Sequence, residues 1–284
     1  MFSAEVQAVQ ELGLDFALIS FEELIAGNLA RAVRTVPQTA AVGIYRGWML
    51  RPHSYEQFYE ALVARGIHLV NEPAAYKHTH YLPESYHLIE SLTPKSIWQS
   101  IDPNVELTDV LQALKTFGNK PVIVKDFVKS QKHHWNEACF IPDASNIAVA
   151  KQIVKRFIEL QGDDLNEGLV FREYIEFESL INHDKSGMPL SKEFRIFYLD
   201  GEPVFYVEYW EQGDYKSLTP PLGEFGDIAK SIHSRFFTMD VAKTVAGQWM
   251  IVELGDAQVA GLPEKADAVE FYRALSNRLK TNGY

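Results

Sequence analysis

The feature that most constrains the fold is a pair of β-hairpins in the C-terminal third of the chain. Residues 192–210, KEFRIFYLDGEPVFYVEYW, contain two apolar segments around Asp200-Gly201, a dipeptide typical of tight hairpin turns. Residues 236–244 and 247–255, FFTMDVAKT and GQWMIVELG, form a second such pair. Strands and helices that follow one another in separate runs predict α+β units and argue against one doubly wound parallel sheet.

The middle of the chain adds further strands and one clear helix. Residues 120–128, KPVIVKDFV, predict a strand, and residues 137–141, EACFI, predict its partner. The amphipathic segment 145–161 predicts a helix, and residues 168–175, GLVFREYI, predict another strand.

The beginning of the chain has a different pattern, because short strands such as 39–45 alternate with helices such as 54–66. We therefore expect an N-terminal α/β domain of residues 1–95 and an α+β domain of residues 96–284.

The composition excludes several classes of protein. The 284 residues contain 27 Lys and Arg against 38 Asp and Glu, so the formal net charge is −11. A chain this acidic is a poor non-specific binder of nucleic acid and of anionic membranes. The single cysteine, Cys139, excludes a disulfide framework and a zinc site built on cysteines. The sequence shows no targeting segment and no long apolar run, so we expect a cytoplasmic protein without a membrane partner.

Five charged residues in these strands are candidates for a functional site. Lys125 follows the apolar run VIV, Glu193 and Arg195 open the first hairpin, and Asp240 and Glu253 lie in the second hairpin. Because side chains alternate along a strand, Glu193 and Arg195 share a face. Asp240 and Glu253 lie on strands joined by a short turn, so they can meet on one face of the pair.

Each of these positions has a physical use. A lysine on a buried strand needs an anionic partner, and a nucleotide phosphate would be one. Glu193 can accept ribose hydroxyls while Arg195 reaches a phosphate. Asp240 and Glu253 would repel each other without a cation, and Mg²⁺ favours one or two carboxylates plus phosphate oxygens. The set predicts a site for a magnesium–nucleotide complex.

These motifs resemble the ATP-grasp ligases over roughly residues 96–284. The resemblance rests on VIVKD, FREYI, EFRIFYLDGEPV and the pair TMDVA and IVELGD, and the third of these is similar to the corresponding hairpin of glutathione synthetase-like members. IYRGWML and VKDFVKSQKHHW resemble a small viral and bacterial clade marked by two arginines and a lysine. The resemblance implies an ATP-grasp fold with subdomains at about 96–173 and 174–284, preceded by a pre-ATP-grasp-like α/β domain.

The resemblance implies roles on the nucleotide side of the site. Lys125 corresponds to the lysine that holds the α- and β-phosphates. Lys129 belongs to the basic run after it, which is either an exposed loop or a phosphate-binding lid. Glu173, Tyr174 and Ile175 correspond to the hinge that borders adenine, largely through backbone groups.

It also implies roles around the transferred phosphate. Glu193 corresponds to the acid on the ribose, and Arg195 corresponds to the arginine near the γ-phosphate. Asp240 and Glu253 correspond to the magnesium ligands.

One departure from the family pattern concerns the metal. Many members carry Asn two residues after the second acid, whereas this chain has Gly255, so that Asp256 is the polar candidate for a further metal ligand. In the resembled clade, Arg46 would face the active-site cleft from the N-terminal domain and would act there with Lys125 and Arg195.

The function implied by the resemblance is ATP-dependent, Mg²⁺-requiring ligation. A phosphoryl group would move to an acceptor, usually a carboxylate on a small molecule or peptide, and an amine would then displace it after ADP release. One alternative is an RNA end-joining ligase of the same fold, with Arg46, Arg172 and the basic and aromatic stretch 125–135 as phosphate contacts. A second alternative is a non-catalytic nucleotide-binding module.

Overall fold

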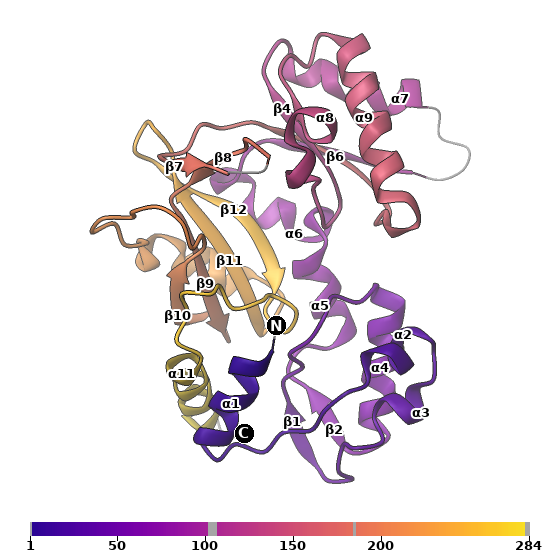
Figure 1. Ribbon diagram of the computed structural model, residues 1–284, viewed down its shortest axis with the longest axis vertical. Helices are drawn as coiled ribbons and strands as arrows, with labels where there is room; N and C mark the ends of the chain where they lie inside the picture. Colours follow the sequence, from indigo (N-terminus) through magenta and orange to yellow (C-terminus); the bar gives the residue numbers. More distant parts are fainter. Residues whose placement is uncertain (1, 102–106, 184–185, 282–284) are drawn as a thin grey trace.

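The computed structural model describes residues 2–101, 107–183 and 186–281 (Figure 1). Within these ranges the chain forms two four-stranded and two two-stranded sheets, with helices packed around them. The α+β class predicted from the sequence is therefore confirmed.

The two predicted hairpins form one antiparallel sheet, the C-terminal sheet, with the strand order β10-β9-β11-β12. Its strands are β9 (Glu193–Leu199), β10 (Glu202–Glu208), β11 (Phe236–Lys243) and β12 (Trp249–Asp256). The turn residues Asp200 and Gly201 have φ angles of 52° and 75°, as a tight hairpin requires. The central strands β9 and β11 are buried at nearly every position, and this burial fixes the register of the sheet.

A second antiparallel sheet, the central sheet, has the strand order β3-β6-β4-β5. Its strands are β3 (Ser96–Ser100), β6 (Gly168–Glu173), β4 (Val122–Asp126) and β5 (Phe140–Ile141). Helix α9 (Ile147–Gln161) lies against it with Val154 and Phe157 fully buried. The Asn146 side chain caps this helix by accepting a hydrogen bond from the Val149 N–H.

The predicted strand 137–141 is wrong in its first part. Helix α8 (Trp135–Ala138) precedes β5, and of the predicted strand only the part in β5 pairs with β4. The helical turn places Trp135 and Ala138, three residues apart, on one buried face, where Trp135 stacks on Phe140 at 5.3 Å.

The first part of the chain contains a parallel strand pair and several helices. Strands β1 (Ala41–Gly43) and β2 (Ile67–Leu69) are joined by α4 (Pro52–Val63). The other helices here are α1 (Ser3–Glu11), α2 (Phe21–Ile25), α3 (Leu29–Ala32), α5 (Pro73–His80) and α6 (Leu82–Ile89).

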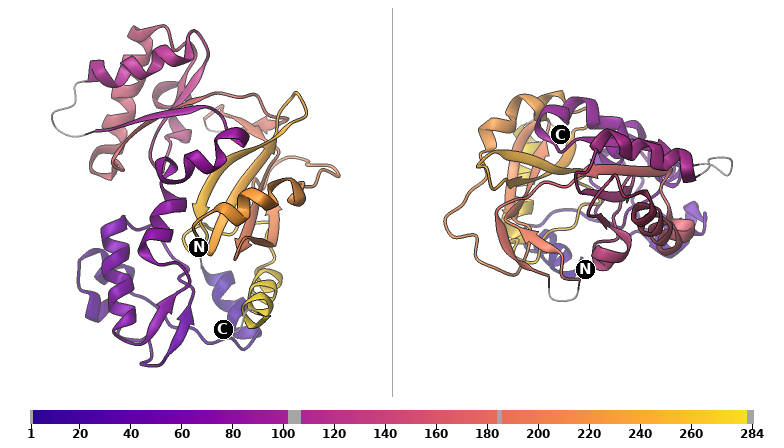
Figure 2. Two further views of the ribbon diagram at one scale, coloured as in Figure 1. Left: turned by 180° about the vertical axis from the view of Figure 1, so that it is seen from behind. Right: turned by 90° about the horizontal axis from the view of Figure 1, so that it is seen from above.

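Three of these helices, α1, α5 and α6, pack on the C-terminal part of the chain. Helix α1 lies beside α11 (Ala268–Thr281), and both views of Figure 2 agree with this arrangement. Helix α6 contributes Leu82, Tyr86 and Ile89 to the core under the C-terminal sheet. The remaining elements are α7 (Leu107–Gln112), α10 (Gly226–Ser231), β7 (Ser179–Asn182), β8 (Pro189–Ser191) and short 3-10 turns.

The two larger sheets are joined by an extended link after β6. Phe177 in this link forms an isolated bridge with Thr244, and the Glu178 N–H donates to the Lys243 carbonyl at 2.7 Å. None of the helices in the described part of the chain combines the length and the apolar character needed to cross a bilayer.

Candidate active site

Three charged residues form a row across three neighbouring strands of the C-terminal sheet. Arg195 on β9 is the register partner of Asp240 on β11, and Asp240 is the partner of Glu253 on β12. Arg195 holds Asp240 through two hydrogen bonds, Nε to Oδ1 at 2.8 Å and Nη2 to Oδ2 at 2.7 Å. A two-point contact between a guanidinium and a carboxylate is strong and fixes the geometry of both groups. The hairpin register therefore aligns the three side chains that the sequence placed on separate strands.

The predicted lysine reaches this row from the other sheet. Lys125 lies on β4 of the central sheet, and its Nζ donates to Glu253 Oε1 at 2.7 Å. Burial raises the pKa of the Glu253 carboxyl, but the cations of Lys125 and Lys132 outweigh burial and lower it to about 2. Glu253 is therefore ionised at neutral pH and lies where the two sheets meet.

A second lysine, Lys132, faces the same carboxylates. Its Nζ lies 5.9 Å from the ring centroids of both Tyr209 and Trp210. Burial lowers the pKa of Lys132, but its attraction to Tyr209 and to the carboxylates of Glu193 and Glu253 outweighs burial, so that the pKa is raised. Of the basic residues after β4, Lys132 therefore places its ammonium group near the carboxylates of the site.

Glu193, the predicted ribose acid, is buried at the start of β9, with 4% of the residue exposed. Burial raises its pKa to about 7, against the opposing effect of Lys132, and Asp240 adds to the rise. A hydroxyl donor or a cation placed beside this group would favour its ionised form.

A cavity of about 560 Å³ opens beside these residues. Arg195, Asp240 and Glu253 line one wall. Met49 and His80, from the first part of the chain, line another wall, and the loop 259–264 after β12 closes the cavity on a third side. The cavity therefore extends from the charged row toward the N-terminal part of the chain.

The predicted adenine hinge lies outside this cavity, at the end of β6. Glu173 forms an ion pair with Lys120 at 2.7 Å, and the Tyr174 ring packs against Trp135 and Phe140. The Tyr174 N–H already donates to the Pro121 carbonyl at 3.0 Å. Ile175 is half-buried in the extended link. The three hinge residues thus lie outside the cavity that Met49 and His80 line.

Lys129 has an exposed side chain on the loop after β4. The Asp126 carboxylate organises this loop by accepting hydrogen bonds from the N–H groups of Val128 and Lys129. Gln161 and Asn166 donate to the other oxygen of the same carboxylate. Lys129 therefore stands on an anchored loop, while its own ammonium group faces outward.

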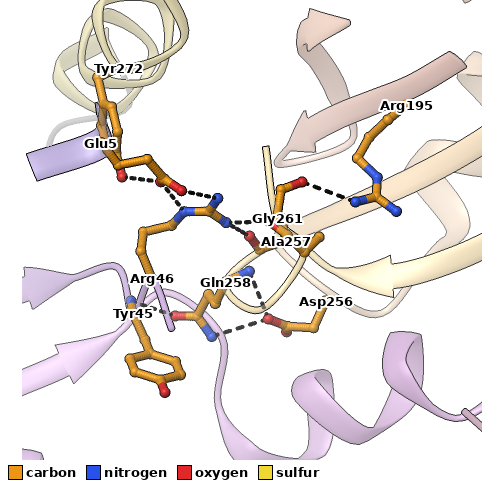
Figure 3. A network of polar contacts seen from close by, with 10 residues as sticks. Glu5, Tyr45, Arg46, Arg195, Asp256, Ala257, Gln258, Gly261 and Tyr272 are labelled. Atoms are coloured by element: carbon orange, nitrogen blue, oxygen red, sulfur yellow. Dashed lines mark hydrogen bonds and ion pairs between the residues drawn. The ribbon is translucent and has the colours of Figure 1, made fainter. Parts of the chain in front are cut away.

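Arg46 is not among the residues that line the cavity, which differs from the expectation that its side chain would face the cleft. Figure 3 shows its side chain directed at Glu5 and at the loop around Ala257. Its guanidinium donates to the Glu5 carboxylate at 2.8 and 3.2 Å and to the carbonyls of Ala257 and Ala260. Tyr272 on α11 donates to the same Glu5 at 2.6 Å. A guanidinium with protein partners on every side holds the loop after β12 in place and is not available to a substrate.

Arg195 holds the other end of that loop. Its Nη1 donates to the Gly261 carbonyl at 3.0 Å (Figure 3). Its guanidinium also lies 4.7 Å from the ring centroid of Tyr209. The loop 257–261 is therefore fixed between two arginines, of which only Arg195 lines the cavity.

The geometry of Asp256 does not fit a metal ligand. Its side chain is fully buried and accepts hydrogen bonds from the Asn71 amide at 2.6 Å and from the Gln258 N–H at 2.9 Å. Residues 253 and 256 are an odd number of positions apart, so their side chains leave opposite faces of β12. Asp256 therefore fastens the N-terminal part of the chain to the C-terminal sheet.

Arg172, a phosphate contact under the RNA alternative, is also committed to protein partners. Its guanidinium donates to the Thr93 hydroxyl at 2.8 Å and to the Ile251 carbonyl at 3.1 Å. Burial lowers its pKa to about 10. Arg46 and Arg172 thus both bond to protein partners, so the two arginines named as phosphate contacts for the RNA alternative are occupied inside the protein.

The remaining carboxylates suit magnesium by their chemistry. In the part of the chain that the structure describes, no group of three or more His, Cys, Asp or Glu side chains could hold a metal ion by itself. Mg²⁺ commonly takes one or two carboxylates together with phosphate oxygens. Asp240 and Glu253 therefore fit this ion when a polyphosphate supplies the other ligands.

Sequence reasoning missed several residues that the fold brings to the site. They are Met49, His80, Tyr209 and Trp210, and the individual role of Lys132 was also not singled out. The run VKSQKHHW was a signal for Lys132, because a cluster of cations in an acidic chain needs anionic partners. Met49 lies in the segment IYRGWML, and Tyr209 and Trp210 end the hairpin segment 192–210, but nothing in these segments or around His80 marked the four residues as lining one site.

Comparisons with known proteins agree with this geometry. A family of ATP-grasp domains, the third family of the R-two-K clade, matches residues 116–275, which is more than half of the chain. No curated protein sequence matches the chain significantly.

Solved structures show the same fold. The chain is similar to the RimK domain ATP-grasp protein of Sphaerobacter thermophilus DSM 20745, at 12% identity and a TM-score of 0.59, over 96% of this chain and 93% of that chain. It is also similar to D-cycloserine synthetase DcsG, at 14% identity and a TM-score of 0.54, over 92% of this chain and 96% of that chain. The chain therefore belongs to the ATP-grasp superfamily of ATP-dependent ligases, within the third family of the R-two-K clade.

Proposed function

We propose that this protein joins a carboxylate acceptor, on a small molecule or peptide, to an amine nucleophile with conversion of ATP to ADP. The observation that carries the proposal is the continuous set of charges formed by Arg195, Asp240, Glu253 and Lys125. The set joins both larger sheets beside one cavity. Such a site can hold a triphosphate and stabilise the charge that moves with its terminal phosphate.

The residues have distinct tasks in this proposal. Lys125 and Lys132 attract the phosphates, and Glu193 accepts hydrogen bonds from the ribose. The hinge of Glu173, Tyr174 and Ile175 borders adenine. Asp240 fixes the orientation of the Arg195 guanidinium, which then meets the γ-phosphate in one geometry.

The proposed reaction has two steps, a phosphoryl transfer and an acyl transfer. An oxygen of the acceptor carboxylate bonds to the γ-phosphorus as the bond to ADP breaks, which gives an acyl phosphate. The amine nitrogen then bonds to the acyl carbon as inorganic phosphate leaves, and the nitrogen gives up a proton. Arg195 and Lys125 stabilise the negative charge on the phosphoryl oxygens during the first transfer.

Asp240 and Glu253 would hold Mg²⁺, and this ion would supply positive charge to neutralise the phosphates. The two carboxylates are balanced by Arg195 and Lys125 in the free protein. The Lys125 ammonium group would therefore shift from Glu253 toward phosphate when the nucleotide binds, while Arg195 keeps its contact with Asp240.

The test is ADP release with MgATP and pools of carboxylic acids, amino acids and short peptides, with and without added amines. We expect acid-dependent ADP release that requires Mg²⁺ and stops on chelation with EDTA. Formation of AMP and pyrophosphate without ADP would rule out the acyl phosphate route.

Variants separate this activity from contamination and from a non-catalytic binding module. Asp240→Asn and Glu253→Gln should each lower ADP release by about 10²-fold or more, because each removes charge at the reacting phosphate. Glu224→Gln, an exposed carboxylate away from the cavity, is the matched control and should behave as the wild type. Turnover that survives in both site variants would refute the proposed catalytic role.

A further inference from the structure

His80 is a cavity-lining residue that no part of the proposed nucleotide site uses. It ends helix α5 in the first part of the chain, outside the region matched by the family. Its side chain is 8% exposed, and it lines the same cavity as Asp240 and Glu253. A buried polar side chain at a cavity wall needs a hydrogen-bond partner, either from the protein or from a ligand.

The protein supplies only ring contacts to this imidazole. The His80 ring lies 5.0 Å from the Tyr76 ring and 5.8 Å from the Tyr81 ring. Among the residues that the structure describes, no hydrogen bond or ion pair reaches either ring nitrogen. The two tyrosines fix the ring plane and leave its polar edge for a ligand.

The imidazole is neutral at physiological pH. Burial is the main cause of its lowered pKa, and nearby Lys129 and Lys125 add to the effect, against Glu253, so that the pKa is about 4. A neutral imidazole offers one N–H donor and one acceptor nitrogen. It can therefore donate to an anionic oxygen without adding a second positive charge beside Lys125.

The position of His80 assigns it to the acceptor side of the site. The adenine hinge of residues 173–175 does not line the cavity, whereas Met49, His80 and the loop 259–264 do. The charged row of Arg195, Asp240 and Glu253 lines the same cavity as His80. A group bound next to His80 would therefore lie beside the charged row in a cavity that the hinge residues do not line.

We propose that His80 is a substrate-binding residue that donates a hydrogen bond to the carboxylate of the phosphoryl acceptor. The proposal rests on the proposed function for the identity of that acceptor. His80 would orient one carboxylate oxygen, and the other oxygen would meet the γ-phosphate beside Arg195.

Two variants test the donor directly. His80→Phe keeps a ring against Tyr76 but has no donor, and His80→Gln keeps a donor near the position of Nε2. The exposed His53→Gln on α4 is the matched control. Each protein is first titrated with MgAMPPNP by calorimetry, and the affinity should stay within about twofold of the wild type if the nucleotide side is intact.

The first readout is turnover with the acid that best stimulates ADP release. We expect the KM for that acid to rise at least about tenfold in His80→Phe, because a hydrogen bond to a charged group is lost. His80→Gln should recover part of the affinity, and the KM for ATP should not move. An unchanged acid KM in His80→Phe would overturn the inference while leaving the ligase function standing.

The second readout does not depend on turnover. The ring resonances of ¹⁵N-histidine-labelled wild type, loaded with MgAMPPNP, are followed during titration with acetate, succinate, glycine and glycylglycine. We expect a saturable shift of the resonance that is missing in His80→Phe, and no shift of the His53 resonance. A His80 shift without ADP release would support this site while refuting the ligase proposal, and no His80 shift with any of these acids would overturn the site.

Discussion

The Nζ atom of Lys125 lies 2.7 Å from Oε1 of Glu253, so one ion pair joins the central sheet to the C-terminal sheet. The lysine is about nine-tenths buried, and the glutamate that it neutralises is a proposed magnesium ligand. The contact therefore sets the spacing of the two sheets at the place where a triphosphate would enter.

Lys125→Met should remove the cation that the phosphates require. We expect kcat/KM for ATP to fall by about 10²-fold or more, because the charge acts in a partly dry site. Steady-state kinetics with MgATP give the value. Lys230→Met, which removes an exposed pair with Glu202, is the control and should leave the kinetics unchanged.

Arg195→Lys keeps a positive charge but loses the planar fork that meets both oxygens of Asp240. We expect kcat to fall by about 10²-fold, since the γ-phosphate no longer meets a fixed donor pair. Calorimetric titration with MgAMPPNP should show a much smaller loss of affinity. An activity equal to the wild type would mean that charge alone suffices at this position.

Asp256 should behave as a structural carboxyl whose ionisation opposes folding. Burial raises its pKa to about 7, so between about pH 4 and pH 7 the folded protein binds this proton more tightly than the unfolded chain does. The free energy of unfolding should therefore fall as the pH rises through this window and level off above it. Glu193, with a pKa also raised to about 7, adds to the same slope.

The variant Asp256→Asn separates the contribution of Asp256 to the pH dependence of stability from that of Glu193. At pH 5 the variant should be less stable by about 1–3 kcal/mol, because the Asn71 amide then faces an amide N–H instead of an acceptor. The difference should narrow toward pH 7, since the variant has no proton to lose. Urea unfolding at pH 5, 6 and 7 measures both effects, and a constant difference at all three values would contradict the assigned cause.

Arg46→Gln should destabilise the fold by removing one partner of a buried ion pair with Glu5. Breaking such a pair costs about 3–5 kcal/mol. The matched control is Arg31→Gln, which removes an exposed contact with Glu23 at 3.8 Å and should change stability by less than about 1 kcal/mol. Equal effects of the two substitutions on the urea midpoint would refute the anchoring role of Arg46.

Sequence reasoning succeeded where the information is local. The Asp200-Gly201 turn predicts the hairpin, and strand alternation predicts that Glu193 and Arg195 share a face. The short turn between β11 and β12 brings Asp240 and Glu253 together as expected from their spacing. These features depend on residues within one hairpin.

Sequence reasoning failed where a side chain finds its partner in a distant segment. The segment around Arg46 resembled one that faces the cleft in the clade. The Arg46 guanidinium instead donates hydrogen bonds to Glu5 and to a carbonyl after β12. Asp256 stands close to a metal ligand in sequence, yet it turns to Asn71, 185 positions away. Nothing in either local pattern specifies these partners.

The sequence by itself determined the two C-terminal hairpins and the order of the charges along them, because backbone alternation and tight turns act over a few residues. Only the tertiary structure decided which charged side chains face the cavity and which form ion pairs and hydrogen bonds inside the protein. The packing of α5 and α11 on the C-terminal sheet, and of α1 on α11, makes that choice, since a buried charge takes the partner that the surrounding segments bring within reach.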